Sequence, residues 1–219
     1  MTAPPYPSYK NLDPFIDVDR LVALDGFITD RIRSRLAAAE DRQFYTGPFL
    51  LDPDAPIRPG SRMIALSRSR AAENYYDLNR AELWEPTDEA REFAPLMDFI
   101  ATLPFAATAR MLIMYDPEGR AVSAHKDHDS AELCHEFIWF RTNLGKPFYM
   151  LDPDTGERLD VAGHSAWFDT VNQFHGADAT GELSFSIRVD GVFSDSFRGR
   201  IPFPQTNRAA APSLWANAG

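Results

Sequence analysis

Residues 184–193 read SFSIRVDGVF, and this stretch is the clearest guide to the fold class. Apolar and polar side chains alternate along it. In an extended strand the apolar set (Phe185, Ile187 and Val189) falls on one face, and the polar set falls on the other, namely Ser184, Ser186, Arg188 and Asp190. This period of two predicts a β-strand whose apolar face packs in the hydrophobic core and whose polar face lines the interior of a barrel.

Four segments earlier in the chain have the same texture, because each is short and rich in aromatic and β-branched residues. They are RMLIMY (110–115), HEFIWFR (135–141), PFYML (147–151) and SAWFDTV (165–171). Turn sequences lie between the segments, namely DPEG (116–119), NLGK (143–146), DPDTGE (152–157) and ATGE (179–182). Short strands at this spacing predict a β-sandwich or barrel over residues 105–195.

The first half of the chain has a different pattern. From Asp19 onward apolar residues recur every three or four positions, which predicts a helix over 19–40. A second helix is expected over 87–103, with Thr87 as its N-cap and a kink or a later start at Pro95. We therefore expect one domain over 1–219, of the α+β class but mainly β. An arm, helices and loops should occupy 1–104, a β core 105–195 and a C-terminal tail 196–219.

Net charge, cysteine content and hydropathy argue against several classes of binding partner and site. The formal net charge of -10 argues against nucleic acid, since binding to a phosphate backbone needs a basic surface. Cys134 is the only cysteine, so an intrachain disulfide framework and a thiolate metal cluster are excluded. Neither a signal-peptide-like segment nor an apolar run of about 18 residues occurs, so we expect a cytoplasmic protein without a membrane partner.

The first indication of a metal site is the pair His125 and Asp127. Residues two apart on a strand point to the same side, about 6–7 Å from each other at the backbone. An imidazole and a carboxylate placed in this way could share a metal ion. Two histidines and one carboxylate on one face form the facial triad that is typical of oxygen-activating non-haem iron. An H-x-D pair alone is a weak signal, because an exposed charged stretch would read the same way.

Two later residues strengthen the interpretation. His175 follows Asp127 by 48 positions, enough for antiparallel strands to return the chain to His125. Arg188 follows His175 by thirteen positions and lies on the polar face of residues 184–193. An arginine directed into a barrel interior needs a carboxylate partner, either a dicarboxylate cosubstrate or a structural partner, Asp190 or Glu182.

The order of these residues resembles that of the 2-oxoglutarate-dependent oxygenase superfamily. Within it, residues 108–193 are similar to the aspartyl/asparaginyl β-hydroxylase family, which includes bacterial free-proline hydroxylases. The residues that carry the resemblance are Arg110, Tyr115, Gly119, His125-Lys126-Asp127, Thr142-Asn143, Phe148, Gly163, Trp167, Asn172, His175, Arg188 and Asp190.

This resemblance implies a double-stranded β-helix, a cupin-like jelly roll, with flanking N-terminal helices. It also implies Fe(II) held by His125, Asp127 and His175, with 2-oxoglutarate and O2 as cosubstrates and Arg188 as the clamp for 2-oxoglutarate. The expected reaction is hydroxylation of a small amino acid or related metabolite, with release of succinate and CO2. Where the family has an Arg and a His two apart, this chain has His135 and Phe137; His135 could still donate a hydrogen bond to the cosubstrate.

Three other functions fit parts of the pattern. A peptidyl Asp/Asn-type β-hydroxylase would use the same residues on a larger substrate. A cupin-like isomerase or hydrolase would use the three metal ligands without 2-oxoglutarate, and so would not need Arg188 as a clamp. A β-sandwich binding module with incidental histidines would bind no divalent metal tightly.

Overall fold

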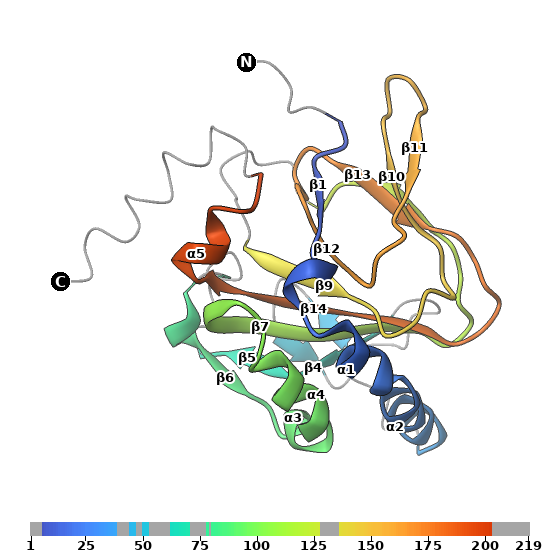
Figure 1. Cartoon of the computed structure of the whole chain (residues 1–219). Coiled ribbons are helices and arrows are strands. Elements are labelled where there is room, and N and C mark those ends of the chain that lie inside the picture. Colours follow the sequence, from blue (N-terminus) through green and yellow to red (C-terminus); the bar gives the residue numbers. More distant parts are fainter. Residues whose placement is uncertain are drawn as a thin grey trace.

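The computed structural model describes residues 6–38, 44–46, 50–52, 62–70, 78, 80–127 and 136–202. Two antiparallel sheets dominate it (Figure 1). The larger sheet has the order β1-β12-β9-β14-β7-β4. Its strands are β1 (Tyr9–Asn11), β4 (Arg62–Ala65), β7 (Phe105–Asp116), β9 (Phe137–Phe140), β12 (Ser165–Phe168) and β14 (Ser184–Phe193).

The smaller sheet has the order β11-β10-β13-β8. Its strands are β8 (Val122–His125), β10 (Phe148–Leu151), β11 (Arg158–Asp160) and β13 (Phe174–Ala177). From β7 to β14 the chain passes repeatedly from one sheet to the other. This alternation is the double-stranded β-helix expected from the sequence. Two short hairpins complete the strands: β2 (Phe44–Thr46) with β3 (Leu50–Asp52), and β5 (Ser67–Ser69) with β6 (Trp84–Pro86).

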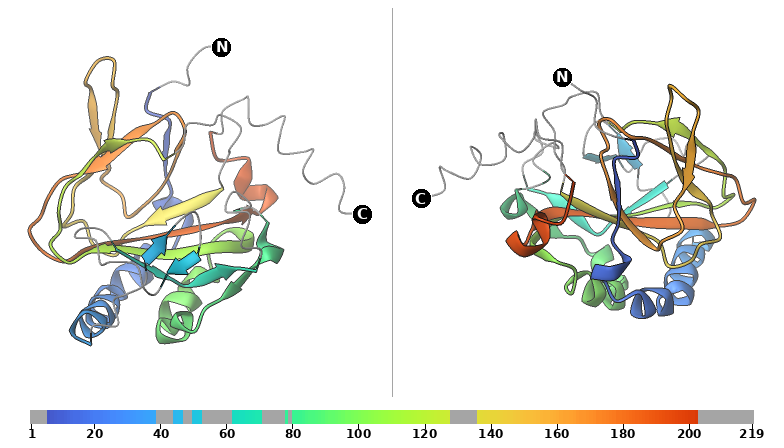
Figure 2. Two further views of the ribbon diagram at one scale, coloured as in Figure 1. Left: turned by 180° about the vertical axis from the view of Figure 1, so that it is seen from behind. Right: turned by 45° about the horizontal axis from the view of Figure 1, so that its top comes forward.

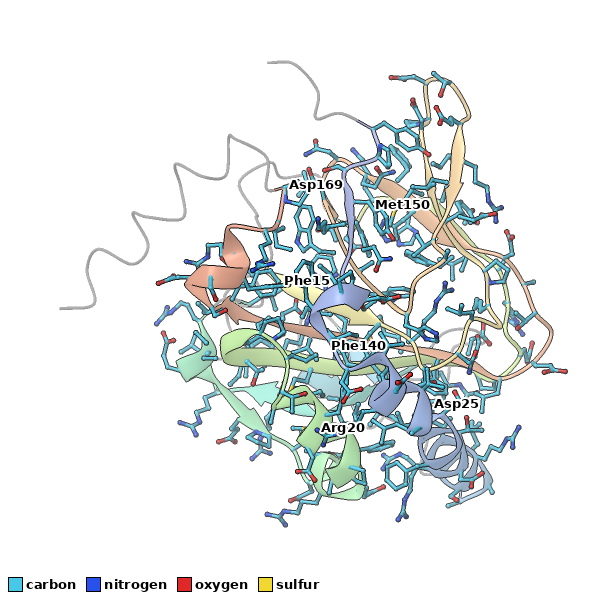
Figure 3. The ribbon with its side chains drawn as sticks, viewed as in Figure 1. Phe15, Arg20, Asp25, Phe140, Met150 and Asp169 are labelled. Carbon is cyan, nitrogen blue, oxygen red and sulfur yellow. The ribbon has the colours of Figure 1, made fainter. Side chains whose placement is uncertain are left out.

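Strand β14 occupies the centre of the large sheet, between β7 and β9. Its bounds coincide with the alternating stretch 184–193. Ile187 and Val189 are fully buried in the hydrophobic core, and Phe140 on β9 packs edge-on against Phe99 with ring centroids 5.5 Å apart. Figure 3 shows Phe140 in this layer and Met150 in the small sheet. The apolar face of β14 therefore belongs to the core, as the alternation predicts.

Helices cover the face of the large sheet that is turned away from the small sheet (Figures 1 and 2). They are α1 (Val18–Ala23), α2 (Asp25–Ala37), α3 (Glu89–Glu92) and α4 (Ala94–Ile100), while η1 (Asp13–Phe15), η2 (Ala81–Leu83) and α5 (Asp195–Arg198) are single turns. No helix in the described residues is long and apolar enough to cross a membrane.

Each expected helix is divided in two. The helix predicted over 19–40 breaks at Leu24, which is the C-cap of α1 and the N-cap of α2. In the second helix Pro95 lies in the first turn of α4, where a missing N–H is tolerated. Thr87 is not the cap that we expected, because its hydroxyl donates to the carbonyl of Ala65 at 2.6 Å; Asp88 takes the N-cap position of α3.

The region before residue 105 also contributes two strands to the large sheet. β1, in the expected N-terminal arm, pairs with β12, and β4 pairs with β7. Both strands are too short for a period-two pattern to be visible, since β1 has three residues and β4 has four.

Candidate metal centre

His125, Asp127 and His175 come together between the two sheets. Oδ1 of Asp127 lies 3.5 Å from Nε2 of His125 and 3.3 Å from Nε2 of His175. The candidate ligand atoms all lie within 4.8 Å of one another. Two imidazoles and one carboxylate at this separation could coordinate a single ion.

Strand pairing explains how residues so far apart in sequence meet. β13 pairs with β8, and His175 lies directly opposite His125 in the register. The two rings are 4.5 Å apart between centroids. His175 is almost fully buried, whereas the side chain of His125 is 46% exposed. The site is therefore open towards solvent on the side of β8.

Asp127 does not lie on a strand with His125, contrary to the expectation for the H-x-D pair. β8 ends at His125, and the chain then bends. The backbone N–H of Asp127 donates to the carbonyl of Thr170 at 2.9 Å. This long-range hydrogen bond, rather than strand geometry, sets the position of the carboxylate.

A tight turn over residues 169–173 supports both Asp127 and His175. Oδ1 of Asp169 accepts hydrogen bonds from the backbone N–H groups of Val171 and Asn172, at 3.1 and 3.2 Å. The turn also contains the Thr170 carbonyl that holds Asp127. Figure 3 labels Asp169 at this turn. Sequence reasoning gave no role to Asp169, although an Asp that caps its own turn is a common local signal.

The two imidazoles are oriented in the same way. Nδ1 of His125 contacts the carbonyl of Ser123 at 2.9 Å, and Nδ1 of His175 contacts the carbonyl of Gln173 at 3.2 Å. Because a carbonyl oxygen only accepts, each Nδ1 carries the proton, and Nε2 is the ring atom that turns towards Asp127.

The orientation of the two imidazoles shows whether a cation fits between their Nε2 atoms and the carboxylate of Asp127. In neutral imidazoles the two Nε2 lone pairs would face the carboxylate of Asp127, so three acceptors would converge without a donor. A proton on an imidazole or a metal ion among the three atoms removes this conflict. The donor set, two neutral nitrogens and one anionic oxygen, suits a first-row divalent metal such as Fe(II). The residues therefore fit the metal that the sequence suggests.

The electrostatics of the site favour an ionised carboxylate. Burial alone would raise the pKa of Asp127, but hydrogen bonds from His125 and His175 and the charge of Arg188 outweigh it and hold the pKa well below its ordinary value. The hydrogen bond to Asp127 raises the pKa of His125, against the effect of its partial burial. A permanently charged carboxylate is available as a metal ligand.

Arg188 is buried beside the candidate ligands. Its guanidinium donates to Oδ2 of Asp127 at 2.9 Å and to Oδ1 of Asp190 at 3.0 Å. Arg110 donates to the other oxygen of Asp190, also at 2.9 Å. The ring of Phe137 lies 4.0 Å from the Arg188 guanidinium carbon. The clamp expected from the sequence thus contacts a candidate metal ligand directly, and Phe137 supports it by a cation–π contact.

A cavity of about 300 Å³ opens from the metal-ligand group between the sheets. Its lining includes the three candidate ligands and Arg188. Aromatic side chains form one side, with Trp139 and Phe148 stacked at 4.4 Å and Phe168 close to His175. The other lining residues with polar groups are Arg62, Tyr115, Asp116, Arg141, Lys146, Ser184 and Ser186. The sequence did not predict Lys146 as a cavity residue, because Lys146 ends the turn sequence NLGK.

His135, which was expected to contact the cosubstrate, and Arg141 have different outcomes. His135, like His128, lies outside the described residues. Arg141 reaches the cavity but donates to the backbone carbonyls of Lys146, Val161 and Gly163, so its guanidinium fixes the loops around the cavity. Trp139 is a cavity wall.

Comparisons with known proteins yield only distant likenesses. No family model matches the sequence, and no curated protein matches it significantly. Among solved structures, a prolyl-4-hydroxylase from Pseudomonas putida is similar at 14% identity and a TM-score of 0.45, covering 84% of this chain and 91% of that chain. A Trichoplax adhaerens prolyl hydroxylase in complex with a hypoxia inducible factor peptide fragment gives 10% identity and a TM-score of 0.44, over 91% of this chain and 89% of that one.

The viral collagen prolyl hydroxylase from Paramecium Bursaria Chlorella virus-1 is a third similar structure. It gives 12% identity and a TM-score of 0.40, and the alignment covers 84% of this chain and 95% of that chain. At these values the likeness is too distant to assign an activity or a family, so function must come from the chain's own residues.

Proposed function

We propose that the protein is an Fe(II)- and 2-oxoglutarate-dependent oxygenase that hydroxylates a small amino acid or a related metabolite. The observation that carries the proposal is the convergence of His125 Nε2 and His175 Nε2 on Oδ1 of Asp127. Its second support is the adjoining cavity, which is large enough for a small ligand but is only about 300 Å³ in volume.

Three residues would hold the metal: His125, Asp127 and His175. Bound Fe(II), together with 2-oxoglutarate and O2, would supply the oxidising power to hydroxylate an unactivated C–H bond, with succinate and CO2 as co-products. Three protein ligands would leave coordination positions for the cosubstrates.

The remaining residues have supporting tasks in this proposal. The carbonyls of Ser123 and Gln173 keep Nε2 of each histidine directed at the metal position. Arg188 holds the second oxygen of Asp127, which favours coordination through Oδ1 alone. Trp139, Phe148 and Phe168 exclude water from one side of the cavity and would orient a small substrate by contact.

A second candidate is a metal-dependent isomerase or hydrolase that does not use 2-oxoglutarate. The observation in its favour is the pairing of Arg188 with Asp127 and Asp190, because this pairing neutralises the residue that was expected to clamp the cosubstrate. Such an enzyme would bind a divalent metal with the same three residues and would turn over without producing succinate.

Succinate formation separates the two candidates. Purified protein, loaded anaerobically with Fe(II), is supplied with 2-oxoglutarate and air in the presence of a panel of free amino acids, peptides and one folded protein. We expect Fe(II)-dependent succinate release that at least one free amino acid stimulates. Stimulation only by peptides or a folded protein would contradict the small-molecule part of the proposal, and no succinate with any substrate would contradict the oxygenase itself.

A further inference from the structure

Lys146 is a cation in the wall of the cavity, and it forms no ion pair with any acidic side chain in the part of the chain that the structure describes. Its ammonium donates to the carbonyl of Arg120 at 2.7 Å and to the hydroxyl of Ser184 at 3.3 Å. Among the residues that the structure describes, no acidic side chain lies within ion-pair distance of it. An ammonium has three N–H donors, so one donor is left for a ligand.

Two other cations of the cavity differ from Lys146 in this respect, while the remaining one, Arg62, is a rival that substitution can test. Arg188 contacts two carboxylates, and Arg141 is fixed by three backbone carbonyls. Partial burial lowers the pKa of Lys146, against the opposing charge of Asp116. Desolvation of a half-buried ammonium that has no carboxylate in direct contact is unfavourable, and an anionic ligand would reduce that penalty.

Ser184 lies towards the end of the cavity that is remote from the metal ligands. On the large sheet it precedes Arg188 by four positions of β14, which span about 13 Å of backbone. Lys146 reaches the same place, because its ammonium donates to the hydroxyl of Ser184. On the small sheet Lys146 precedes β10, whose first residue, Phe148, pairs with Ala177.

The surface between the two ends suits a short polar chain. Ser186 lies halfway between Ser184 and Arg188 on the same face of β14, and it lines the cavity. Trp139 and Phe148 form the stacked aromatic wall. A linear dicarboxylate could place one end at the metal ligands and the other at Lys146, with its methylene groups against the aromatic rings.

We propose that Lys146, assisted by the hydroxyl of Ser184, binds the distal carboxylate of a dicarboxylate ligand, the role that the sequence assigns to Arg188. The identity of that ligand as 2-oxoglutarate rests on the proposed function. The carboxylate subsite itself does not, because Lys146 and Ser184 would bind a carboxylate in the absence of a metal.

The test compares two ligands that differ only in the distal carboxylate. Isothermal titration of the full chain, loaded with Fe(II) under anaerobic conditions, measures the Kd of 2-oxoglutarate and of 2-oxopentanoate. The variants are Lys146→Met, Lys146→Arg, Ser184→Ala and Arg62→Gln. Lys10→Met is the matched control, because Lys10 is also half-buried but lies on β1 and does not line the cavity.

We expect Lys146→Met to raise the Kd of 2-oxoglutarate by about 10- to 100-fold, since a charge-assisted hydrogen bond is lost. The Kd of 2-oxopentanoate should change by less than about twofold, as no bond to it is lost. Lys146→Arg should bind 2-oxoglutarate more tightly than Lys146→Met does, and Lys10→Met should bind as the wild type. Unchanged 2-oxoglutarate binding in Lys146→Met, an equal loss for both ligands, or a loss confined to Arg62→Gln would overturn the proposal.

A second titration distinguishes failure of this proposal from failure of the oxygenase proposal. Glutarate has two carboxylates but no keto group, so its binding to metal-free protein reports on the subsite alone. We expect wild type and Lys10→Met to bind glutarate and Lys146→Met to bind it at least about tenfold more weakly. If the Fe(II)-loaded wild type does not bind 2-oxoglutarate but glutarate binding depends on Lys146, the oxygenase proposal is wrong and the carboxylate subsite is confirmed. Glutarate binding that is absent, or independent of Lys146, overturns the subsite.

Discussion

Arg188 and Asp127 form a partly buried ion pair in which the guanidinium holds Oδ2 of the carboxylate at 2.9 Å. Oδ1 of the same carboxylate faces the two imidazoles. The two oxygens of Asp127 therefore have different partners. A carboxylate fixed in this way is oriented for a metal before any ion arrives, because Arg188 is itself held by Asp190 on the same strand.

Replacing Arg188 by Met removes this support. Asp127 and the fully buried Asp190 both lose a cation, and we expect the free energy of unfolding to fall by about 3–5 kcal/mol, as is typical when one partner of a buried pair is removed. The Fe(II) affinity should fall about 10- to 100-fold, in line with the loss of a residue that orients a metal ligand. Urea unfolding and anaerobic metal titration measure the two effects.

Arg158 provides the control for this substitution. It pairs with Asp160 and Asp178 at the surface, where solvent screens the charges, so Arg158→Met should lower the free energy of unfolding much less than Arg188→Met does and should leave Fe(II) binding unchanged. Equal effects of the two substitutions would show that the Arg188–Asp127 pair has no special role.

Gly176 is the residue next to His175 for which the structure leaves no room for a side chain. A Cβ at this position would lie 2.6 Å from the carbonyl of Val122 on β8 and 2.6 Å from the hydroxyl of Tyr149 on β10. Gly176→Ala should therefore force β13 away from its neighbours, lower stability by about 1–3 kcal/mol and weaken Fe(II) binding through His175. Thermal unfolding with and without Fe(II) is the measurement.

Gly26→Ala is the matched substitution, since nothing lies within 4 Å of its Cβ position in α2. In a helix the exchange should raise stability by about 0.5–1 kcal/mol. A Gly176→Ala variant as stable as the wild type, with undiminished Fe(II) binding, would contradict the tight packing of β13.

Asp169 offers a way to disturb the site without touching a candidate ligand. Asp169→Ala removes the acceptor that forms the turn over 169–173, from which the carbonyls of Thr170 and Gln173 contact Asp127 and His175. We expect a loss of about 1–3 kcal/mol in stability, as buried hydrogen-bond partners are left unsatisfied, together with weaker Fe(II) binding.

Asp152→Ala removes a similar turn-capping carboxylate in the exposed β10–β11 hairpin, where Oδ1 accepts from the N–H of Asp154 at 2.9 Å. This variant should retain wild-type Fe(II) affinity. If both aspartate variants bind Fe(II) equally well, the turn over 169–173 does not position the site.

The sequence predicted a β-rich core because the evidence for its strands is local, whereas the double-stranded β-helix was implied by the resemblance to the oxygenase superfamily. Alternation along 184–193 is visible in ten residues, and the strand has those bounds. The first and fourth strands could not be found in this way, because each is stabilised by pairing with a distant strand rather than by its own pattern. The same distinction applies to the two predicted helices, whose breaks at Leu24 and Phe93 depend on how the segments pack on the sheet.

The sequence predicted which three residues meet at the candidate site, but not what surrounds them. Residue type and order suggested His125, Asp127 and His175, and the register between β8 and β13 brings the two histidines together. The partners of Arg188 could not be read from the sequence, since they depend on how the bend after β8 approaches β14. Lys146 could not be predicted as a cavity residue either, because a lysine in a turn is usually exposed to solvent.

The central claim is that His125, Asp127 and His175 hold one Fe(II) ion. Anaerobic titration of the metal-free full chain with Fe(II), in the presence of 2-oxoglutarate, measures it directly. We expect one ion per chain, no measurable binding to His175→Ala, strongly weakened binding to Asp127→Ala, and wild-type binding to Asp178→Ala, whose carboxylate pairs with Arg158 at the surface. Binding of Fe(II) to His175→Ala and Asp127→Ala with wild-type affinity, or no binding to the wild type, would contradict the account.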